Sequence, residues 1–427
     1  MRHWTGLFMG LLYLAVTHAD SASDPTLTLI PEAVATQWLA HDPTVLAAHS
    51  DLDAAQIEAA QFEASPYEWT SKLTYQQRAF REGTNSHEWN VGLERQVRLP
   101  AKRRVDSAIA AATVALAKAR LSLARRQAAA DLIGGWLDWS SAHAVKILLM
   151  QQQQLAENNL NAVIKRVKSG DAATLEQRLA AAEVNDVERS ASVAATDETI
   201  AYAKLTSRFM AEGAPLPAPL PEPVSPAHDV AWWQAQVRAV SDQLTAARAE
   251  QAKAEAIAAR ADAERVPDPT LGVYAASEMR GDEDIVGGTI SIPFPGERRT
   301  LEVRRRLAEV NATRDRLAAT EREVEGMARA AYAALEGQYR RWQLASAAAV
   351  ALRENAAIAQ KAYVLGEQDL QTLLLARRQA LSGAEAEQQA RAAALRAHYA
   401  LLLDAKLLWQ GVDASTVRAE EIEGRPK

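Results

Sequence analysis

The sequence of 427 residues contains no cysteine, and only 6% of its residues are aromatic. Without cysteine there can be no disulfide framework, no thiolate metal site, no cysteine nucleophile and no lipid anchor attached through an N-terminal cysteine. The net charge of −6 shows no basic excess of the kind that marks a nucleic-acid binder, so no nucleic acid is expected as a partner. A negative mean hydropathy excludes a polytopic helical membrane protein, but it does not exclude a β-barrel, whose strands are only half apolar.

Signatures of catalysis and of metal binding are also missing. The sequence has no GxSxG, HExxH, P-loop or dinucleotide-binding motif in the required context, which predicts a protein that is not an enzyme and needs no cofactor. None of its 8 histidines lies three or four residues from another, and only 6 methionines are present. This spacing predicts no catalytic residue and no resident metal site.

The N-terminal residues predict export. Arg2 precedes an apolar stretch over 4–16, and the small residue Ala19 follows it, which is the order of a secretory signal. The alternative is a membrane anchor, but an apolar run of ~13 residues is shorter than the ~20 that span a bilayer. We therefore expect 1–19 to be a signal peptide and 20–427 to be the mature protein.

The mature sequence is duplicated around a proline-rich linker at 211–228. The segment Leu99-Pro-Ala-Lys-Arg-Arg104 corresponds to Phe294-Pro-Gly-Glu-Arg-Arg299, with an offset of 295 − 100 = 195 between the prolines. Gly170 corresponds to Gly366 with an offset of 366 − 170 = 196. Two landmarks at nearly the same interval predict structural repeats at 31–210 and 229–409, followed by a C-terminal tail at 410–427.

Each repeat predicts the same succession of elements. An alanine-rich helical stretch leads into two short alternating segments, which precede a very long helix, a glycine and a shorter helix. The long helices would reach close to ~100 Å at ~1.5 Å per residue, far more than a compact domain needs, and such helices usually pack in coiled-coil arrays. The fold class is therefore mainly α with a small β part. The helical ranges are 32–64, 101–168 and 171–209, then 229–265, 296–364 and 367–409.

The alternating segments predict transmembrane strands. Apolar residues alternate with polar ones from Tyr67 to Gln76 and again from Trp89 to Leu99, and a weaker copy of this hairpin spans 271–292. Strands of ~10 residues with aromatic ends are typical of outer membrane barrels. The aromatic residues expected at the membrane interface are Tyr67, Trp69, Tyr75 and Trp89. The alternative is a half-exposed hairpin on a soluble protein.

Four strands cannot close a barrel, and an open sheet edge in lipid leaves backbone groups unpaired at several kcal/mol each. Several chains must therefore share one barrel. Two chains would give about eight strands, whose side chains nearly fill the interior, and three would give about twelve with an aqueous pore. The charges expected in the lumen are mixed in sign and predict no strong ion selectivity: Glu68, Lys72, Glu94 and Arg98.

The duplicated plan, the two Pro-x-x-Arg-Arg elements and the two glycine tips resemble the TolC-like outer membrane efflux channels. The resemblance covers the whole mature chain. It implies a homotrimer in the outer membrane of a Gram-negative bacterium, with a 12-stranded β-barrel in lipid and an α-helical barrel in the periplasm. Its partners would be a periplasmic adaptor and an inner membrane pump of the RND type. The modest length and short turns look most like the heavy-metal subgroup, the cobalt–zinc–cadmium type.

Two sets of residues are candidates for contacts with membrane and partners. The basic residues after each hairpin oppose the helix macrodipole, so we expect phosphate head groups of the inner leaflet to favour them, or else simple solvation. These are Lys102, Arg103, Arg104, Arg298 and Arg299. The second set would form the periplasmic tips and dock the adaptor: Gly170, Asp171, Gly366, Glu367 and Asp369.

Some members of the family carry an acidic ring near the second tip, and this sequence departs from that pattern. The matching positions are Thr372 and Leu375, although Glu367 and Asp369 could substitute. The alternative to a channel is a periplasmic adaptor or a coiled-coil scaffold without a pore. An adaptor normally has one helical hairpin and many short strands, whereas this chain predicts two helical arrays and four strands.

Overall fold

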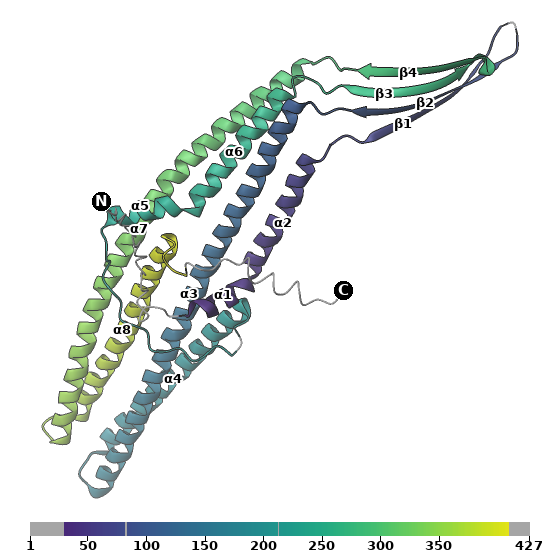
Figure 1. The fold of residues 1–427 in the computed structure, drawn as a ribbon. Coiled ribbons are helices and arrows are strands. Elements are labelled where there is room, and N and C mark those ends of the chain that lie inside the picture. The colour runs from purple at the N-terminus through teal and green to yellow at the C-terminus, as the bar shows by residue number, and fades with distance from the viewer. Residues whose placement is uncertain (1–29, 82, 212, 410–427) are drawn as a thin grey trace, which may run out of the picture.

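The structure is a computed structural model that describes residues 30–409 except 82 and 212. The predicted signal peptide at 1–19 and the predicted tail at 410–427 lie outside the described residues. The described chain is a long helical rod with a β-sheet projecting from one end and two helical hairpins at the other (Figure 1). This confirms the expected fold class, mainly α with a small β part.

The same order of elements occurs twice along the chain. Each time, two successive helices lead into a β-hairpin, and a very long helix and a shorter one follow. The first set is α1 (Glu32–Ala40), α2 (Pro43–Glu63), β1 (Trp69–Arg78), β2 (Ser86–Gln96), α3 (Pro100–Ser169) and α4 (Thr174–Phe209). The second set is α5 (Val230–Val240), α6 (Asp242–Ala263), β3 (Thr270–Glu278), the 3-10 turn η1 (Met279–Gly281), β4 (Glu283–Ser291), α7 (Glu297–Val364) and α8 (Leu370–Asp404).

The first helical stretch of each repeat is broken in two, where the sequence predicted one continuous helix. In the first repeat, the carboxylate of Asp42 caps α2 by accepting the backbone N–H groups of Thr44 at 2.9 Å and Val45 at 3.2 Å. Pro43 lacks an N–H group and therefore begins α2 without the loss of a hydrogen bond. In the second repeat, Ser241 caps α6 in the same way. A local capping group thus restarts each helix in a new direction.

Each break is held by the end of the short helix of the same repeat. Arg208 of α4 donates to the buried Asp42 at 3.0 Å, and Lys406, just after α8, contacts Asp242 at 2.5 Å. Burial alone would raise the pKa of Asp42, but hydrogen bonds from Thr44, Arg208 and two backbone amides hold it below its usual value. The duplication seen in the sequence therefore reappears as a pair of equivalent ionic clasps.

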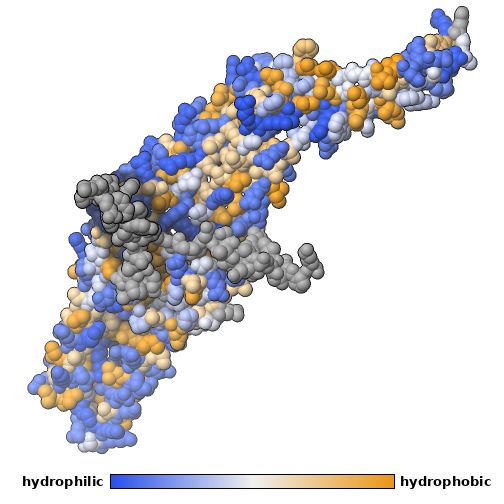
Figure 2. Space-filling view, viewed as in Figure 1, coloured by the Kyte–Doolittle hydropathy of each residue, from blue (hydrophilic) through white to orange (hydrophobic). Residues whose placement is uncertain are grey.

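The four strands form one antiparallel sheet in the order β1-β2-β3-β4. One row of neighbouring residues runs Leu73, Val91, Ala275 and Val286, across both hairpins. The adjacent row, which points to the other face, consists of Lys72, Gly92, Tyr274 and Gly287. Because side chains alternate along a strand, the whole sheet has one apolar face and one polar face. Apolar side chains are visible over the strands in Figure 2.

The rod is thickest where α1, α3, α4 and α8 meet around a cluster of tryptophans. The ring centroids of Trp38 and Trp136 are 6.0 Å apart, and Trp139 lies 5.3 Å from Trp136. Among the described residues, α3 is the one helix long and apolar enough to cross a membrane by composition. Its Leu132 and Leu137 are fully buried in this cluster, so packing inside the protein accounts for much of its apolar character.

The glycine at the first tip gives a test of this architecture. Gly170 has φ of 83°, a left-handed conformation in which a Cβ costs about 1–2 kcal/mol. Gly326 lies within α7 with open space around its Cα, and alanine favours a helix there by about 1 kcal/mol. We expect Gly170→Ala to lower the thermal unfolding midpoint and Gly326→Ala to raise it, as followed by circular dichroism. A higher midpoint for Gly170→Ala would contradict the turn.

Candidate functional site

The apolar face of the sheet carries aromatic residues near both ends. Trp69 at the start of β1 is 61% exposed, while Tyr75 pairs with Trp89 in the register six residues further along. At ~3.3 Å per residue the two aromatic levels lie about 20 Å apart, close to the height of the apolar band of a membrane barrel. Tyr67 does not belong to these levels, contrary to the sequence prediction. Its hydroxyl donates a hydrogen bond to Asp268 at 2.6 Å inside the protein.

The polar face of the sheet carries paired charges. Lys72 and Glu94 form an ion pair at 2.8 Å across β1 and β2. Near the hairpin turns, Arg78 contacts both Glu88 and Glu278 at 3.1 Å. Both cations of this face, Lys72 and Arg78, are therefore matched by at least one carboxylate on the next strand. The third cation of the strands, Arg95, lies at the end of the opposite face beside Trp69 and donates to the backbone carbonyl of Tyr67 at 3.1 Å.

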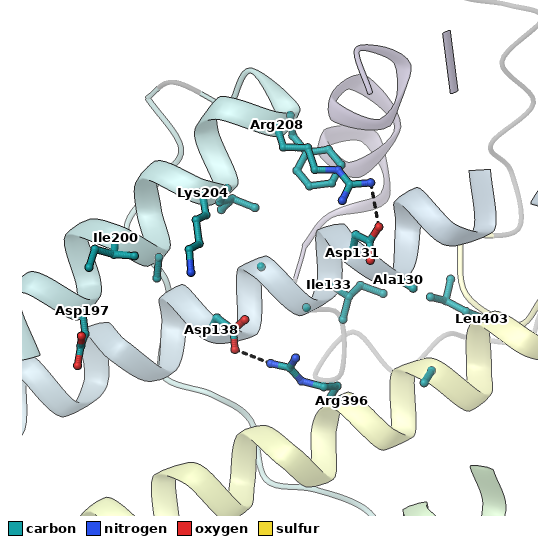
Figure 3. A pocket seen from close by; sticks show the side chains of 16 residues that line it. Ala130, Asp131, Ile133, Asp138, Asp197, Ile200, Lys204, Arg208, Arg396 and Leu403 are labelled. Atoms are coloured by element: carbon teal, nitrogen blue, oxygen red, sulfur yellow. Dashed lines mark hydrogen bonds and ion pairs between the residues drawn. The ribbon is translucent and has the colours of Figure 1, made fainter. Parts of the chain in front are cut away.

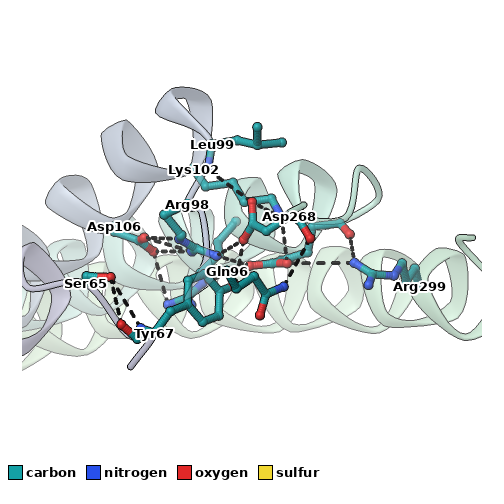
Figure 4. A network of polar contacts seen from close by, with 11 residues as sticks. Ser65, Tyr67, Gln96, Arg98, Leu99, Lys102, Asp106, Asp268 and Arg299 are labelled. Carbon is teal, nitrogen blue, oxygen red and sulfur yellow. Dashed lines mark hydrogen bonds and ion pairs between the residues drawn. The ribbon is translucent and has the colours of Figure 1, made fainter. Parts of the chain in front are cut away.

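Arg98, which follows β2, lies inside the protein and not on the polar face of the sheet where the sequence placed it. Its guanidinium side chain is 3% exposed and binds Asp106 of α3 through two nitrogens, at 2.9 and 2.8 Å. It also contacts Glu264 at 2.6 Å and Asp268 at 3.2 Å, both from the segment between α6 and β3 (Figure 4). One side chain thus joins the two repeats where the sheet meets the helices.

Lys102 completes this network and corrects a second prediction. Its ammonium group is buried and lies 3.0 Å from both Glu264 and Asp268, so it cannot face lipid head groups. These carboxylates explain why a cation is stable in the first turn of α3, where the helix macrodipole opposes it. Arg299 of α7 donates to the backbone carbonyl of Glu264 and is half-buried. The other three basic residues of the predicted set are exposed: Arg103, Arg104 and Arg298.

Hydrogen bonding keeps the acids of the network ionised. Burial alone would raise the pKa of Glu264, but Arg98 and Lys102 hold it below its usual value. The pKa of Asp268 is lowered against burial by Tyr67, Lys102 and the backbone N–H of Leu99. Burial alone would lower the pKa of Arg98, but Glu264 and Asp106 raise it. Glu264, Asp268 and Arg98 are therefore charged at neutral pH.

A groove that sequence reasoning missed runs along the rod between α4 and α8, with α3 as its floor. Its main hollow has a volume of about 670 Å³, and the consecutive glycines Gly134 and Gly135 of α3 are among its lining residues. Figure 3 shows this hollow. A second hollow of about 440 Å³ shares Asp138, Asp197 and Arg396 with it. The sequence did contain one sign of this groove, the two consecutive glycines in the interior of a long helix. Glycine is unfavourable within a helix, so its presence there suggests that another group approaches the backbone closely.

The rim of the groove carries both signs of charge. Arg208 pairs with Asp131 at 2.8 Å, and Arg396 of α8 pairs with Asp138 of α3 at 2.5 Å. Lys204 also lines the groove, and Figure 3 shows its ammonium directed into the hollow. No ion-pair partner within residues 30–409 is found for Lys204. The groove combines apolar lining residues with charged edges.

The helix tips contain both predicted glycines in turns. Gly170 and Gly366 have φ of 83° and 77°, and each follows the end of a long helix. Asp171 accepts a hydrogen bond from the hydroxyl of Ser169 at 2.6 Å. Asp369 is the N-cap of α8 and accepts the backbone N–H of Thr372 at 2.8 Å, and hydrogen bonds from the side chain and backbone of Thr372 lower its pKa. Asp369 therefore has a structural role, and both Glu367 and Asp369 are exposed at the second tip.

The two helical hairpins are tied together just above their tips. Arg166 of α3 donates to the hydroxyl of Tyr363 of α7 at 2.8 Å, and this hydroxyl donates to Glu176 of α4 at 3.3 Å. Behind this triad, a small apolar cluster joins the same hairpins through Val163, Ala180, Leu370 and Leu373. The sequence alone did not reveal this tie. Tyr363 lies 197 residues from Arg166 and 187 residues from Glu176 along the chain.

No protein-family model matches this chain, and the curated proteins contain no match to it either. Among solved structures, the fold is similar to that of the outer-membrane channel OprN, with a TM-score of 0.73, 19% identity and 91% of each chain covered. The CmeC outer membrane channel of Campylobacter jejuni has a TM-score of 0.73 at 14% identity, covering 93% of this chain and 89% of that one. The outer membrane protein VceC of Vibrio cholerae has a TM-score of 0.70 at 17% identity, covering 87% of this chain and 94% of that one. At this identity the likeness shows the fold, which is that of TolC-like channel protomers.

The ion network predicts a large effect of one substitution. Removing one partner of a buried charge cluster leaves the others unpaired and costs about 3–5 kcal/mol. We expect Arg98→Met to lower the free energy of unfolding by that amount. Arg103→Met, which removes an exposed cation one turn away, should change it by less than about 0.5 kcal/mol. Urea titration of the purified protein measures both, and equal effects would contradict a central role for Arg98.

Proposed function

We propose that this protein is the protomer of a trimeric outer membrane exit channel of a Gram-negative bacterium. The observation that carries the proposal is the four-stranded sheet with one continuous apolar face and one polar face. On the apolar face, Leu73 is 76% exposed and Val286 is 86% exposed. Such a face is unfavourable in water and favourable in lipid, provided that the backbone groups at the sheet edges find partners.

Copies of the chain can supply those partners. Neither β1 nor β4 has a neighbour on its outer edge within the described part of the chain. The two edge strands run in opposite directions, so β4 of one copy can pair with β1 of the next in the same antiparallel manner. Three copies close a barrel of about twelve strands with an aqueous lumen, whereas two give a barrel that side chains fill. The polar face with its ion pairs would line that lumen.

The membrane boundary follows from this arrangement. Trp69 would lie at the periplasmic interface, and Tyr75 and Trp89 at the outer one. Beyond Trp69, the exposed residues Arg103 and Arg298 follow the ends of β2 and β4 by a few residues along the chain. Phe294, in the segment between β4 and Arg298, is also fully exposed. Phosphates of the inner leaflet would stabilise each of these cations, and the adjacent Arg104, by about 1 kcal/mol.

The helical rod would form a tunnel through the periplasm. Its partners would be a periplasmic adaptor and an inner membrane pump of the RND type, which supplies the energy for transport. The groove lined by Gly134 and Gly135 and the tips around Asp171 and Glu367 offer the adaptor its docking surface. The triad around Tyr363 would hold the two hairpins in the closed arrangement at the tunnel entrance.

The cargo we propose is divalent metal cations, on the resemblance of the sequence to the heavy-metal efflux subgroup. Within residues 30–409, no group of three or more acidic, histidine or cysteine side chains is arranged to hold a metal ion. A passive duct does not require such a site, because its task is to conduct the cargo that the pump delivers. Specificity would then belong to the pump.

The sheet provides a direct test of the membrane assignment. A lysine on the lipid face of a barrel strand costs about 2–4 kcal/mol near the midplane, whereas a lysine on the lumen face is tolerated. We expect Leu73→Lys to abolish trimers in carbonate-washed outer membranes, and Thr74→Lys, the next residue along the strand, to leave them intact. If both variants behave alike, or the wild type is a soluble monomer, the protein is an adaptor or scaffold without a pore.

A deletion strain tests the cargo. We expect it to become sensitive to cobalt, zinc and cadmium but not to dyes or detergents, and the wild-type gene to restore resistance. Growth inhibition across a single panel that also contains nickel and copper measures this. Sensitivity to organic compounds with unchanged metal resistance would overturn the metal proposal while leaving the channel proposal standing.

A further inference from the structure

The turn between β3 and β4 folds over the polar face of the neighbouring hairpin. The hydroxyl of Ser86 accepts the backbone N–H of Arg280 at 2.8 Å. Glu88, two residues further along β2, lies against the same turn. Both β2 residues are covered as a result, with exposures of 0% for Ser86 and 2% for Glu88. The turn therefore bends toward β2 instead of extending the line of its own strands.

The side on which the turn lies follows from the alternation of β2. Ser86 and Glu88 alternate with Trp89 and Val91, which belong to the apolar face, so the turn covers the opposite, polar face. This step rests on the proposed function, in which the polar face lines the lumen of a barrel. A turn over that face at the end farthest from the helices overhangs the outer mouth of the pore (Figure 1).

The backbone of the turn needs these contacts. Met279, Arg280 and Gly281 are three consecutive residues with φ of 50°, 66° and 94°. A left-handed conformation is sparsely populated by residues other than glycine, and it persists only where surrounding groups hold it. Ser86 supplies the hydrogen bond, and the buried Glu88 packs beside it. The guanidinium of Arg280 adds a contact to the Thr84 hydroxyl at 2.6 Å.

We propose that residues 279–281 form a lid that narrows the outer mouth of the channel, with the Arg280 side chain as its lip. Three copies in a trimer would converge on the exit. The lid is a second constriction in series with the helix tips, and it restricts the size of solutes that pass between the lumen and the outside. Ser86 and Glu88 anchor it to the barrel wall.

Size-dependent labelling of a single thiol tests the lid. The chain has no cysteine, so Thr74→Cys places one thiol per protomer on the polar face of β1, below the lid. A small methanethiosulfonate and a bulky polyethylene-glycol maleimide are added to whole cells. Both reagents reach the introduced thiol at position 74 only from outside. With the anchors removed by Ser86→Ala and Glu88→Ala, we expect the bulky reagent to gain at least about fivefold in rate relative to the small one.

Two further variants guard against indirect effects. Glu94→Ala removes a carboxylate from the same face without touching the turn, and it should leave the ratio of the two rates unchanged. Arg280→Gly removes the lip and relieves the left-handed strain while keeping the backbone bond to Ser86, and it should raise the ratio.

The outcomes separate the lid from the proposed function. Unchanged ratios in both the anchor and the lip variants, with trimers intact, would overturn the lid. A thiol at position 74 that neither reagent labels in folded trimers would show that the polar face does not line water, which contradicts the channel itself.

Discussion

The buried ion network around Arg98 determines how the sheet joins the helical rod. Its two buried cations, Arg98 and Lys102, come from the first repeat and two of its acids, Glu264 and Asp268, from the second, so neither repeat can form this junction alone. The side chains of Lys102 and Asp268 are each 1% exposed. Charges so deeply buried are tolerable only as a complete set, because each lost partner leaves an unpaired charge. The angle between the strands and the helices of the rod is thereby fixed for both hairpins at once.

The network also shows how a duplicated sequence becomes an asymmetric protomer. The clasps at Asp42 and Asp242 are equivalent in the two repeats, since each joins a helix break to the end of a short helix. At the junction the repeats differ. Lys102 follows Pro100 by two residues, and the corresponding residue after Pro295 is Glu297, which is exposed. At this position only the first repeat therefore places a fully buried cation, and the second contributes carboxylates together with the part-exposed Arg260 and Arg299.

The exit duct proposed above would place simple demands on its wall. One face would have to suit lipid, the other water, and the ends would have to control passage. In this chain a two-faced sheet, paired charges on its polar face, a tie between the helical hairpins and a turn folded over the polar face would meet those demands with ordinary packing and hydrogen bonding. Long helices with small apolar side chains then extend the wall without requiring a globular core.

The sequence by itself determined the features that depend on local periodicity and repetition. The two-residue alternation of the strands, the length of α3 and α7 and the glycine turns at Gly170 and Gly366 follow from residues close together along the chain, and the duplication doubles each signal. What only the tertiary structure decided depends on residues far apart. Lys102 and Tyr67 carry patterns typical of a membrane interface, yet both bond to the buried Asp268, which is 166 residues from the first and 201 from the second, so Lys102 is buried and Tyr67 is half-buried. A charge or hydroxyl reveals its polarity in the sequence, but its partner, and hence its location, is set by the packing of distant segments.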